Sequence, residues 1–253
     1  MKIALLADTH SNLEALQACL AHAAREGAGN FAFLGDLVGY GADPVACLAL
    51  IETYAERGAL LVRGNHDQAA LVGLCDNMNP IAREAIYWTR RQLGDKERAF
   101  LSALPMTTRH SDLLLVHASA HTPESWPYVY GQNQARLCMN ASEAPICFVG
   151  HMHHQMLYWS PKLDPKHLSA GVQAFPPTPG VPIPLSRSRR WLAIAGSVGQ
   201  PRDGNNAAAY ALFDDECRSL TFFRVPYDHH SAARKVVAAG LPEQLALQLL
   251  RGE

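Results

Sequence analysis

Ile3-Ala-Leu-Leu-Ala7 followed by Asp8-Thr-His10 decides how this chain folds, because a short apolar run ends there in side chains that can bind metals. Four further apolar runs end in Asp, Asn or His in the same manner. Short, nearly continuous apolar runs that are closed by turn residues are typical of buried strands. We therefore expect strands at 3–7, 31–34, 60–62, 113–116 and 146–149.

The polar ends of these runs lie where an α/β sheet forms its ligand sites. They are Asp8-Thr-His10, Gly35-Asp36, Gly64-Asn65-His66-Asp67, His117 and Gly150-His151-Met-His153. In open α/β sheets, ligands bind in the crevice beyond the carboxyl ends of the strands. Five strands that carry these side chains at the same end therefore predict one site.

The residue types in this set suit two divalent cations. Cations roughly 3.5–4 Å apart need a bridging ligand, and a carboxylate with two oxygens can bridge where an imidazole cannot. Asp36 is the central carboxylate, so we expect it to bridge. Asn65 adds a neutral amide oxygen, which leaves more positive charge on the cation than a second carboxylate would. Such charge acidifies a bound water and polarises a phosphoryl oxygen, so the set indicates phosphoester hydrolysis by a metal-bridging hydroxide.

Each motif by itself has a simpler structural explanation. An Asp-x-His triplet or a Gly-Asp pair at a strand end is usually a capped turn, in which glycine supplies a positive φ. A lone histidine such as His117 is more often a partly buried residue whose hydrogen bonds are satisfied. The joint occurrence of five such motifs after five apolar runs favours the metal site.

The order and context of these motifs resemble the calcineurin-like metallophosphoesterase family. The segment Gly196-Ser-Val-Gly-Gln-Pro-Arg-Asp-Gly204, which precedes a strand, resembles the small bacterial phosphoesterases and phosphodiesterases of that family. The family pattern D-x-H, G-D, G-N-H-[DE], H and G-H-x-H is matched in order between residues 8 and 153. The ligand sets that the resemblance implies are Asp8, His10, Asp36 and His153 for one metal, and Asp36, Asn65, His117 and His151 for the other. It also implies a catalytic role for His66 off the metals, where it protonates the leaving oxygen or holds a phosphate oxygen.

Helices and further strands complete an α/β pattern. The helices that we expect are at 12–26, 45–57, 80–93 and 95–104, with a closing helix over 236–250 that is broken near Gly240-Leu-Pro242. Strands at 191–195, 207–213 and 220–225 are expected to form a second, partly antiparallel sheet packed on the first. The resemblance implies the same α/β class, as a four-layer α-β-β-α sandwich with two mixed β-sheets. We expect a single metallophosphoesterase domain over 1–253.

A proline-rich insertion interrupts this pattern at about 160–188, which contains seven of the 16 prolines. Proline-rich connections adopt extended or polyproline geometry. The insertion is either a solvent-exposed connection or a lid, because it begins just after His151-Met-His153 and ends before Gly196.

The loop after Asp36 departs from the protein phosphatase branch of the family. Gly35-Asp-Leu-Val-Gly-Tyr-Gly41 lacks the Arg that this branch carries there. The loss removes a bidentate phosphate clamp, which disfavours a phosphoprotein substrate. A small phosphoester, with a nucleotide as one candidate, is the expected substrate.

Three residues outside the ligand sets are candidate substrate contacts, namely Arg63, Arg202 and Asn12. Arg202 follows the glycines Gly196 and Gly199, and it could replace the missing clamp or pair with its neighbour Asp203. Asn12 could contact phosphate or cap the helix that follows it, and the cap is the simpler explanation.

Two further features have both a structural and a functional interpretation. Trp126-Pro-Tyr-Val-Tyr130 could stack a nucleobase or anchor a loop. Asp67 could orient His66 or stabilise its own turn. The sequence does not choose between these interpretations.

The composition is compatible with an enzyme of one domain. With 253 residues, 48% of them hydrophobic, the chain can bury a sizeable core. A formal net charge of −1 gives no general attraction to nucleic acids or anionic membranes. The apolar run before Asp8 is too short for a signal peptide, and no run approaches the roughly 20 apolar residues of a spanning helix. We expect a cytoplasmic protein, and its oligomeric state stays open.

One functional hypothesis and two alternatives follow. The leading hypothesis is a metal-dependent phosphodiesterase or phosphatase that acts on a small substrate, with a nucleotide as one candidate. The alternatives are a hydrolase of dinucleoside polyphosphates and a non-catalytic scaffold stabilised by metal. Mixed imidazole, carboxylate and amide ligation suits Mn, Fe, Zn, Co or Ni, and we expect two divalent Mn or Fe ions.

Overall fold

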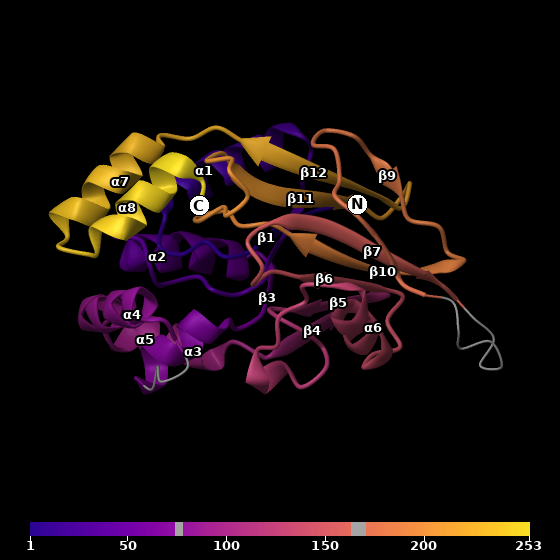
Figure 1. Cartoon of the computed structure of the whole chain (residues 1–253), viewed down its shortest axis with the longest axis horizontal. Coiled ribbons are helices and arrows are strands. Elements are labelled where there is room, and N and C mark those ends of the chain that lie inside the picture. Colours follow the sequence, from indigo (N-terminus) through magenta and orange to yellow (C-terminus); the bar gives the residue numbers. More distant parts are fainter. Residues whose placement is uncertain (74–77, 163–170) are drawn as a thin grey trace.

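Two mixed sheets of six strands each form the centre of the molecule in the computed structural model, which describes residues 1–73, 78–162 and 171–253 (Figure 1). The strands of the first sheet are β1 (Lys2–Leu6), β2 (Asn30–Phe33), β3 (Leu60–Leu61), β9 (Ile183–Pro184), β11 (Ala208–Asp214) and β12 (Ser219–Val225), in the order β3-β2-β1-β11-β12-β9. The strands of the second sheet are β4 (Thr107–His110), β5 (Leu113–Val116), β6 (Ile146–Val149), β7 (Gln155–Pro161), β8 (Gln173–Phe175) and β10 (Arg189–Ala195), in the order β4-β5-β6-β10-β7-β8.

Each sheet contains parallel strands bordered by antiparallel ones. β1 runs parallel to β2, with Ile3 opposite Asn30, and antiparallel to β11, with Leu5 opposite Ala211. β6 runs parallel to both β5 and β10, whereas β7 is antiparallel to β10. Parallel neighbours end at the same edge of a sheet, so the loops that follow them can share one site.

The apolar residues of each strand are divided between two cores. In β1, Ile3 and Leu5 belong to the core between the sheets, whereas Leu6 packs under the helices that cover the first sheet. In β5, Leu115 faces the first sheet and Leu114 faces the outer layer. Successive residues of a strand point to opposite faces, so a strand buried on both faces requires a nearly continuous apolar run. Each fully buried leucine or isoleucine contributes about 1.5–3 kcal/mol to this packing.

Helices form the two outer layers. The α-helices of the described residues are α1 (Leu13–Arg25), α2 (Pro44–Ala55), α3 (Asn65–Val72), α4 (Pro80–Gln92), α5 (Asp95–Ala103), α6 (Gln132–Asn140), α7 (His229–Ala238) and α8 (Glu243–Arg251). α1 and α2 pack on the outer face of the first sheet, and α6 packs on the outer face of the second. α7 and α8 form a hairpin at one end of the molecule (Figure 1). These layers confirm the predicted α-β-β-α sandwich.

The distribution of strands between the sheets differs from the expectation. We expected the ligand-bearing strands in one sheet and the three later strands in another, and this is wrong. β1, β2 and β3 share the first sheet with β11 and β12, whereas β5 and β6 share the second with β10. A run that is apolar on both faces carries no signal for which neighbour it pairs with, so the sequence could not decide this point.

Several element boundaries also differ. β4 escaped the sequence analysis because its residues are mostly exposed and polar, with no apolar alternation. α7 begins at His229, earlier than the expected closing helix at 236, because the Asp228 side chain accepts from the Ser231 backbone N–H and caps it. The predicted break near Gly240 separates α7 from α8.

The described part of the proline-rich insertion extends both sheets. β8 pairs with β7, and β9 pairs with β12. Leu185 is buried between the sheets, so this part of the connection contributes to the core. Residues 163–170, which include Pro165, lie outside the described residues.

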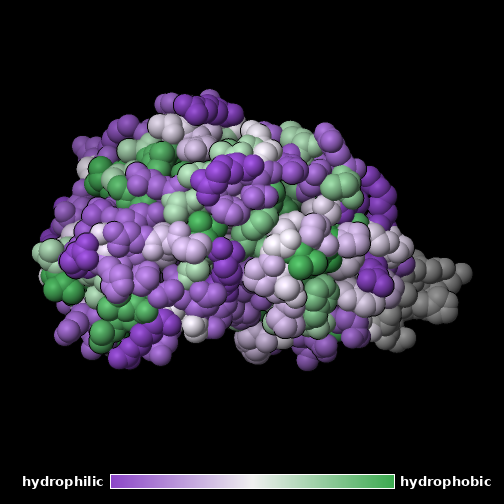
Figure 2. All heavy atoms as spheres, turned by 90° about the horizontal axis from the view of Figure 1, so that it is seen from above, coloured by the Kyte–Doolittle hydropathy of each residue, from purple (hydrophilic) through white to green (hydrophobic). Residues whose placement is uncertain are grey.

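The face seen in Figure 2 carries mainly hydrophilic residues, with hydrophobic residues scattered among them. Within the ranges that the structure describes, no helix combines the length and the apolar character needed to cross a bilayer.

Candidate metal centre

Side chains from the loops of both sheets converge at one end of the sandwich. In chain order, they are Asp8 and His10 after β1, Asp36 after β2, Asn65 and His66 at the start of α3, His117 after β5, and His151 and His153 between β6 and β7. Every predicted ligand and the predicted catalytic histidine therefore lie in loops, or at a helix start, that directly follow a strand. The site lies where the two sheets end, rather than at the edge of a single sheet.

Five of the predicted ligands adopt left-handed backbone conformations. They are Asp8 (φ 53°), His10 (φ 48°), Asp36 (φ 51°), His151 (φ 66°) and His153 (φ 61°). Asp and His enter this region more readily than most other residues, but it still costs about 1–3 kcal/mol each and is concentrated at functional sites. These sharp turns direct the side chains of residues two positions apart, Asp8 with His10 and His151 with His153, toward the same donor cluster.

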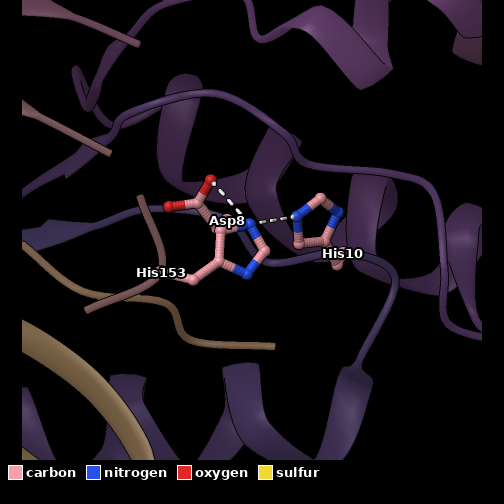
Figure 3. A group of neighbouring side chains, drawn as sticks. All are labelled: Asp8, His10 and His153. Atoms are coloured by element: carbon pink, nitrogen blue, oxygen red, sulfur yellow. Dashed lines mark hydrogen bonds and ion pairs between the residues drawn. The ribbon is translucent and has the colours of Figure 1, made fainter. Parts of the chain in front are cut away.

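Buried donor atoms form three overlapping groups. The groups are Asp8, His10 and His153 (Figure 3), then His10, Asp36 and His66, then Asp36, His117 and His151, and within each group the donors lie within 4.8 Å of one another. His10 Nε2 lies 3.1 Å from His153 Nε2, and His117 Nε2 lies 3.2 Å from His151 Nδ1. Two nitrogens bound to one cation at about 2.1 Å would lie roughly 3–3.4 Å apart. The spacing therefore fits a shared cation in each pair.

Asp36 lies between two of these donor groups. Its Oδ2 is 3.7 Å from His10 Nε2 and 3.4 Å from His117 Nε2. Its Oδ1 accepts the backbone N–H of His66 at 2.8 Å, which fixes the carboxylate in place. Asn65 Oδ1 lies 3.1 Å from His117 Nε2, beside the third donor group. This is the arrangement that a bridging carboxylate and an amide ligand require.

Backbone carbonyls orient three of the histidines. The contacts are His10 Nδ1 to the Val38 carbonyl at 3.2 Å, His117 Nδ1 to the Leu34 carbonyl at 2.8 Å, and His153 Nδ1 to the Gln200 carbonyl at 2.6 Å. A carbonyl only accepts, so Nδ1 carries the proton and the Nε2 lone pair is left for a metal. Every residue has a carbonyl, so no sequence signal could have identified these three.

Asp67 braces two of the ligand loops. Its Oδ1 accepts the backbone N–H groups of Leu37 at 2.8 Å and Val38 at 3.2 Å, and its Oδ2 accepts that of Gly64 at 2.8 Å. These contacts support the turn-stabilising interpretation of Asp67. A Cβ on Gly64 would lie 2.1 Å from the Asp36 backbone nitrogen, so only glycine permits this approach of the two loops.

His66 and Tyr40 form one wall of the site. His66 is buried, and among the described residues its Nδ1 has no hydrogen-bond partner. The Tyr40 ring centroid lies 4.5 Å from that of His66 and 4.6 Å from that of His10. The motif analysis did not single out Tyr40. The sequence signal that could have found it is its position between Gly39 and Gly41. In the structure, Tyr40 has a left-handed backbone conformation with a φ of 59°.

Burial and charge pairing set the protonation of the site. Burial raises the pKa of Asp8 to about 8 and lowers the pKa of His66 to about 4. Burial also lowers the pKa of His117, but the carboxylates of Asp36 and Asp8 outweigh it and hold that pKa at about 9. Metal ligands must be deprotonated, so cations would take the place of the protons on Asp8 and His117. The donor set therefore fits a metal centre.

Two of the candidate substrate contacts have structural partners. The Asn12 side chain caps α1 by accepting the Ala15 backbone N–H at 3.1 Å, and it donates to the Gly199 carbonyl at 2.9 Å. Arg63 donates to Gln68 Oε1 at 2.8 Å and to the Ser102 carbonyl. The Asn12 amide and the two terminal nitrogens of Arg63 are thus engaged in holding loops and helices together.

Arg202 is placed differently. It donates to the Tyr40 hydroxyl at 3.2 Å and to Gln200 Oε1 at 2.7 Å, and its neighbour Asp203 pairs with Arg224 instead. Both of these partners are neutral, so neither compensates the positive charge of Arg202. After burial, Arg202 is the strongest influence that lowers the pKa of His153, which shows that its charge acts on the donor cluster.

Comparisons with known proteins match the sequence and the fold of this chain. The model of the calcineurin-like phosphoesterase superfamily domain matches residues 1–216. An uncharacterised protein of Methanocaldococcus jannaschii is 34% identical over 255 residues, which cover 99% of this chain and 98% of that protein. The crystal structure of a metallophosphoesterase from Sphaerobacter thermophilus is 36% identical, with a TM-score of 0.86 and full coverage of both chains. A hypothetical protein from Pyrococcus horikoshii shares the fold at 20% identity, with a TM-score of 0.77 over 100% of this chain and 98% of that chain.

Proposed function

Because the chain belongs to the calcineurin-like phosphoesterase superfamily, we propose that it is a metal-dependent hydrolase of small phosphoesters, with the candidate metal centre as its active site. The observation that carries the proposal is the convergence of seven donor residues and His66 from five loops of both sheets. The substrate is proposed to be small and nucleotide-like, cleaved as a phosphodiester or a phosphomonoester.

Two divalent cations are proposed as the cofactor. The proposed ligand sets are Asp8, His10, Asp36 and His153 for one, and Asp36, Asn65, His117 and His151 for the other. When bound, the cations would supply Lewis acidity toward phosphoryl oxygens and would lower the pKa of a water molecule. Imidazole, carboxylate and amide ligands suit several first-row metals, and we expect Mn or Fe in the active protein.

The residues of the chain divide the remaining work. Asp36, whose Oδ1 is fixed by the His66 N–H, holds its other oxygen toward His10 and His117. The His66 side chain lies next to the donor groups and would donate a hydrogen bond to a leaving oxygen or to a phosphate oxygen. Arg202 would attract and hold the anionic phosphoester, because among the described residues its side chain donates to neutral groups and has no carboxylate partner.

Metal dependence of hydrolysis tests the proposed function. We expect chelator-stripped protein to be inactive on bis(p-nitrophenyl) phosphate and p-nitrophenyl phosphate, and to gain activity when Mn²⁺ or Fe²⁺ is added. The release of p-nitrophenolate gives the rate, and the comparison of the two esters gives the preference for diesters or monoesters. Elemental analysis of the protein after gel filtration gives the number of metals bound.

The outcomes of this test separate the alternatives. If the protein binds metal but hydrolyses no phosphoester, including dinucleoside polyphosphates, the scaffold hypothesis replaces the phosphoesterase hypothesis. Activity that persists after the metal has been removed would show that the metal centre is not the catalytic site.

The proposed contact of Arg202 with the substrate is tested by replacing Arg202 with Gln. Arg202→Gln removes the charge but keeps hydrogen-bonding groups, and we expect kcat/KM to fall about 10- to 150-fold, mainly through KM, as for loss of one charged hydrogen bond. Steady-state kinetics measures the split between KM and kcat. Arg234→Gln, at an exposed position of α7, is the matched control and should leave both constants unchanged. An unchanged KM in Arg202→Gln would assign Arg202 to the packing of Tyr40 alone.

A further inference from the structure

An aromatic segment borders the metal centre on the side of the second sheet. Residues 121–131 connect the region of His117 to α6, and they carry Trp126, Tyr128 and Tyr130 within five positions. None of these three rings is fully buried, and Tyr130 is one of the most exposed hydrophobic residues of the described chain.

Tyr128 lies flat on a predicted metal ligand. Its ring centroid is 4.1 Å from that of His151, with an angle of 18° between the planes, so the two rings are stacked. The inner face of Tyr128 is thereby covered, yet 51% of the residue remains exposed, which leaves the outer face open. The open face is thus nearly parallel to the His151 ring, and the thickness of the Tyr128 ring separates it from that ligand.

Trp126 lies against the neighbouring ligand. Its ring centroid is 5.9 Å from that of His117, in an edge-on arrangement. Its φ of 53° is a left-handed conformation, which a bulky residue adopts only under strain from its surroundings. The chain therefore holds an indole next to His117 at a cost in backbone energy.

Anchoring of the loop does not explain these rings. Val129, between the two tyrosines, is buried in the core under α6, where it packs with Ala135 and Met139. Val129 is buried, whereas Tyr128 and Tyr130 are 51% and 71% exposed, so the two tyrosines lie on the solvent side of this segment. The apolar anchor is thus a valine, and the tyrosines are available for another role.

We propose that the outer face of Tyr128 is a stacking platform for a nucleobase of the substrate, with Trp126 at its side. The proposal rests on the proposed function, because it places the phosphate of the same nucleotide at the metal centre. A planar base stacks on an aromatic face whatever its hydrogen-bonding pattern, so the platform selects nucleotides over sugar phosphates and accepts more than one base. His151 and Tyr128 would form the first two layers of the stack, and the base would form the third.

The test compares adenosine 5′-monophosphate with ribose 5-phosphate, which share a phosphate and a ribose and differ by the base. KM is measured on the Mn²⁺-loaded protein where phosphate is released, and Kd by calorimetry where it is not. We expect the nucleotide to be favoured by about 5- to 150-fold, the range that stacking of one base supplies. The readout is the ratio of the two values within each variant, which Tyr128→Ala should bring to about one and Tyr128→Phe should retain. Tyr87→Ala, on α4, is the control, because Tyr87 is exposed to a similar extent (47%).

Two results would overturn the platform. One is equal affinity of the unmodified protein for the two ligands, and the other is a preference that survives in Tyr128→Ala. If ribose 5-phosphate still binds in a metal-dependent manner in either case, the proposed phosphoesterase function stands without the platform. If neither ligand binds and no phosphoester is hydrolysed, the proposed function fails together with it.

Discussion

Replacing Asp36 by Asn is expected to lower kcat/KM for phosphoester hydrolysis by about a thousandfold or more. Asp36 Oδ2 faces both His10 and His117, at 3.7 Å and 3.4 Å from their Nε2 atoms. In the variant, turning the single amide oxygen toward the cations leaves the NH2 group facing the His66 N–H donor. The amide oxygen also carries no charge, so it binds two cations far more weakly than a carboxylate does. Lewis-acid stabilisation is worth several kcal/mol, and each 1.4 kcal/mol is a tenfold change in rate.

Metal content decides whether Asp36 acts as the bridge. We expect Asp36→Asn to bind less metal per chain than the unmodified protein, measured by elemental analysis, with a circular dichroism spectrum that shows a folded chain. Asp36→Glu keeps the charge on a longer side chain and should recover part of the metal binding. The control is Asp228→Asn, which should change nothing because Asn caps a helix as well as Asp does. Full metal content and full activity in Asp36→Asn would contradict the bridging role.

Replacing His66 by Ala is expected to slow hydrolysis of alkyl phosphoesters by about 10²- to 10⁴-fold, the range of general acid catalysis. The His66 ring lies beside the donor groups and is buried against Tyr40, so the variant removes a hydrogen-bond donor from the buried donor cluster. A nitrophenolate leaving group needs little protonation, so esters of p-nitrophenol should lose much less activity. The measurement is the dependence of log kcat/KM on the pKa of the leaving group.

The sequence left two roles open for His66, and they predict different slopes of log kcat/KM against the pKa of the leaving group. A loss that grows with the pKa of the leaving group indicates action on the leaving oxygen, and a uniform loss indicates contact with a phosphate oxygen. His110→Ala, at an exposed position of β4, serves as the histidine control. Unchanged turnover of alkyl esters would remove His66 from catalysis, and a loss of bound metal that parallels the loss of rate would make it a ligand. The second outcome is chemically accessible, since His66 shares a donor group with His10 and Asp36.

The candidate site was more predictable than the pairing of the strands. Three of the candidate ligands were recognisable because each follows an apolar run, namely Asp8, Asp36 and His117. Metal binding depends on the type of side chain, so a ligand leaves a signal in the sequence. The supports of the site were not recognisable, because the carbonyls of Leu34, Val38 and Gln200 act through the backbone, and any residue type supplies a carbonyl. The candidate substrate contacts divided in the same way, since Asn12 could be interpreted as a cap but the partners of Arg202 could not be foreseen.

The sequence by itself determined where buried strands lie and which side chains they present at their ends, because the run from Ile3 to Ala7 and its equivalents must be buried on both faces. The tertiary structure alone decided that β1 and β2 join one sheet while β5 and β6 join the other. It also decided that Tyr128 lies on His151, across more than 20 positions of the chain. The physical reason is that the free energy of burying an apolar side chain depends on the buried area and hardly on which neighbour covers it. Strand pairing and ring stacking, in contrast, depend on specific contacts between segments that are distant in the sequence.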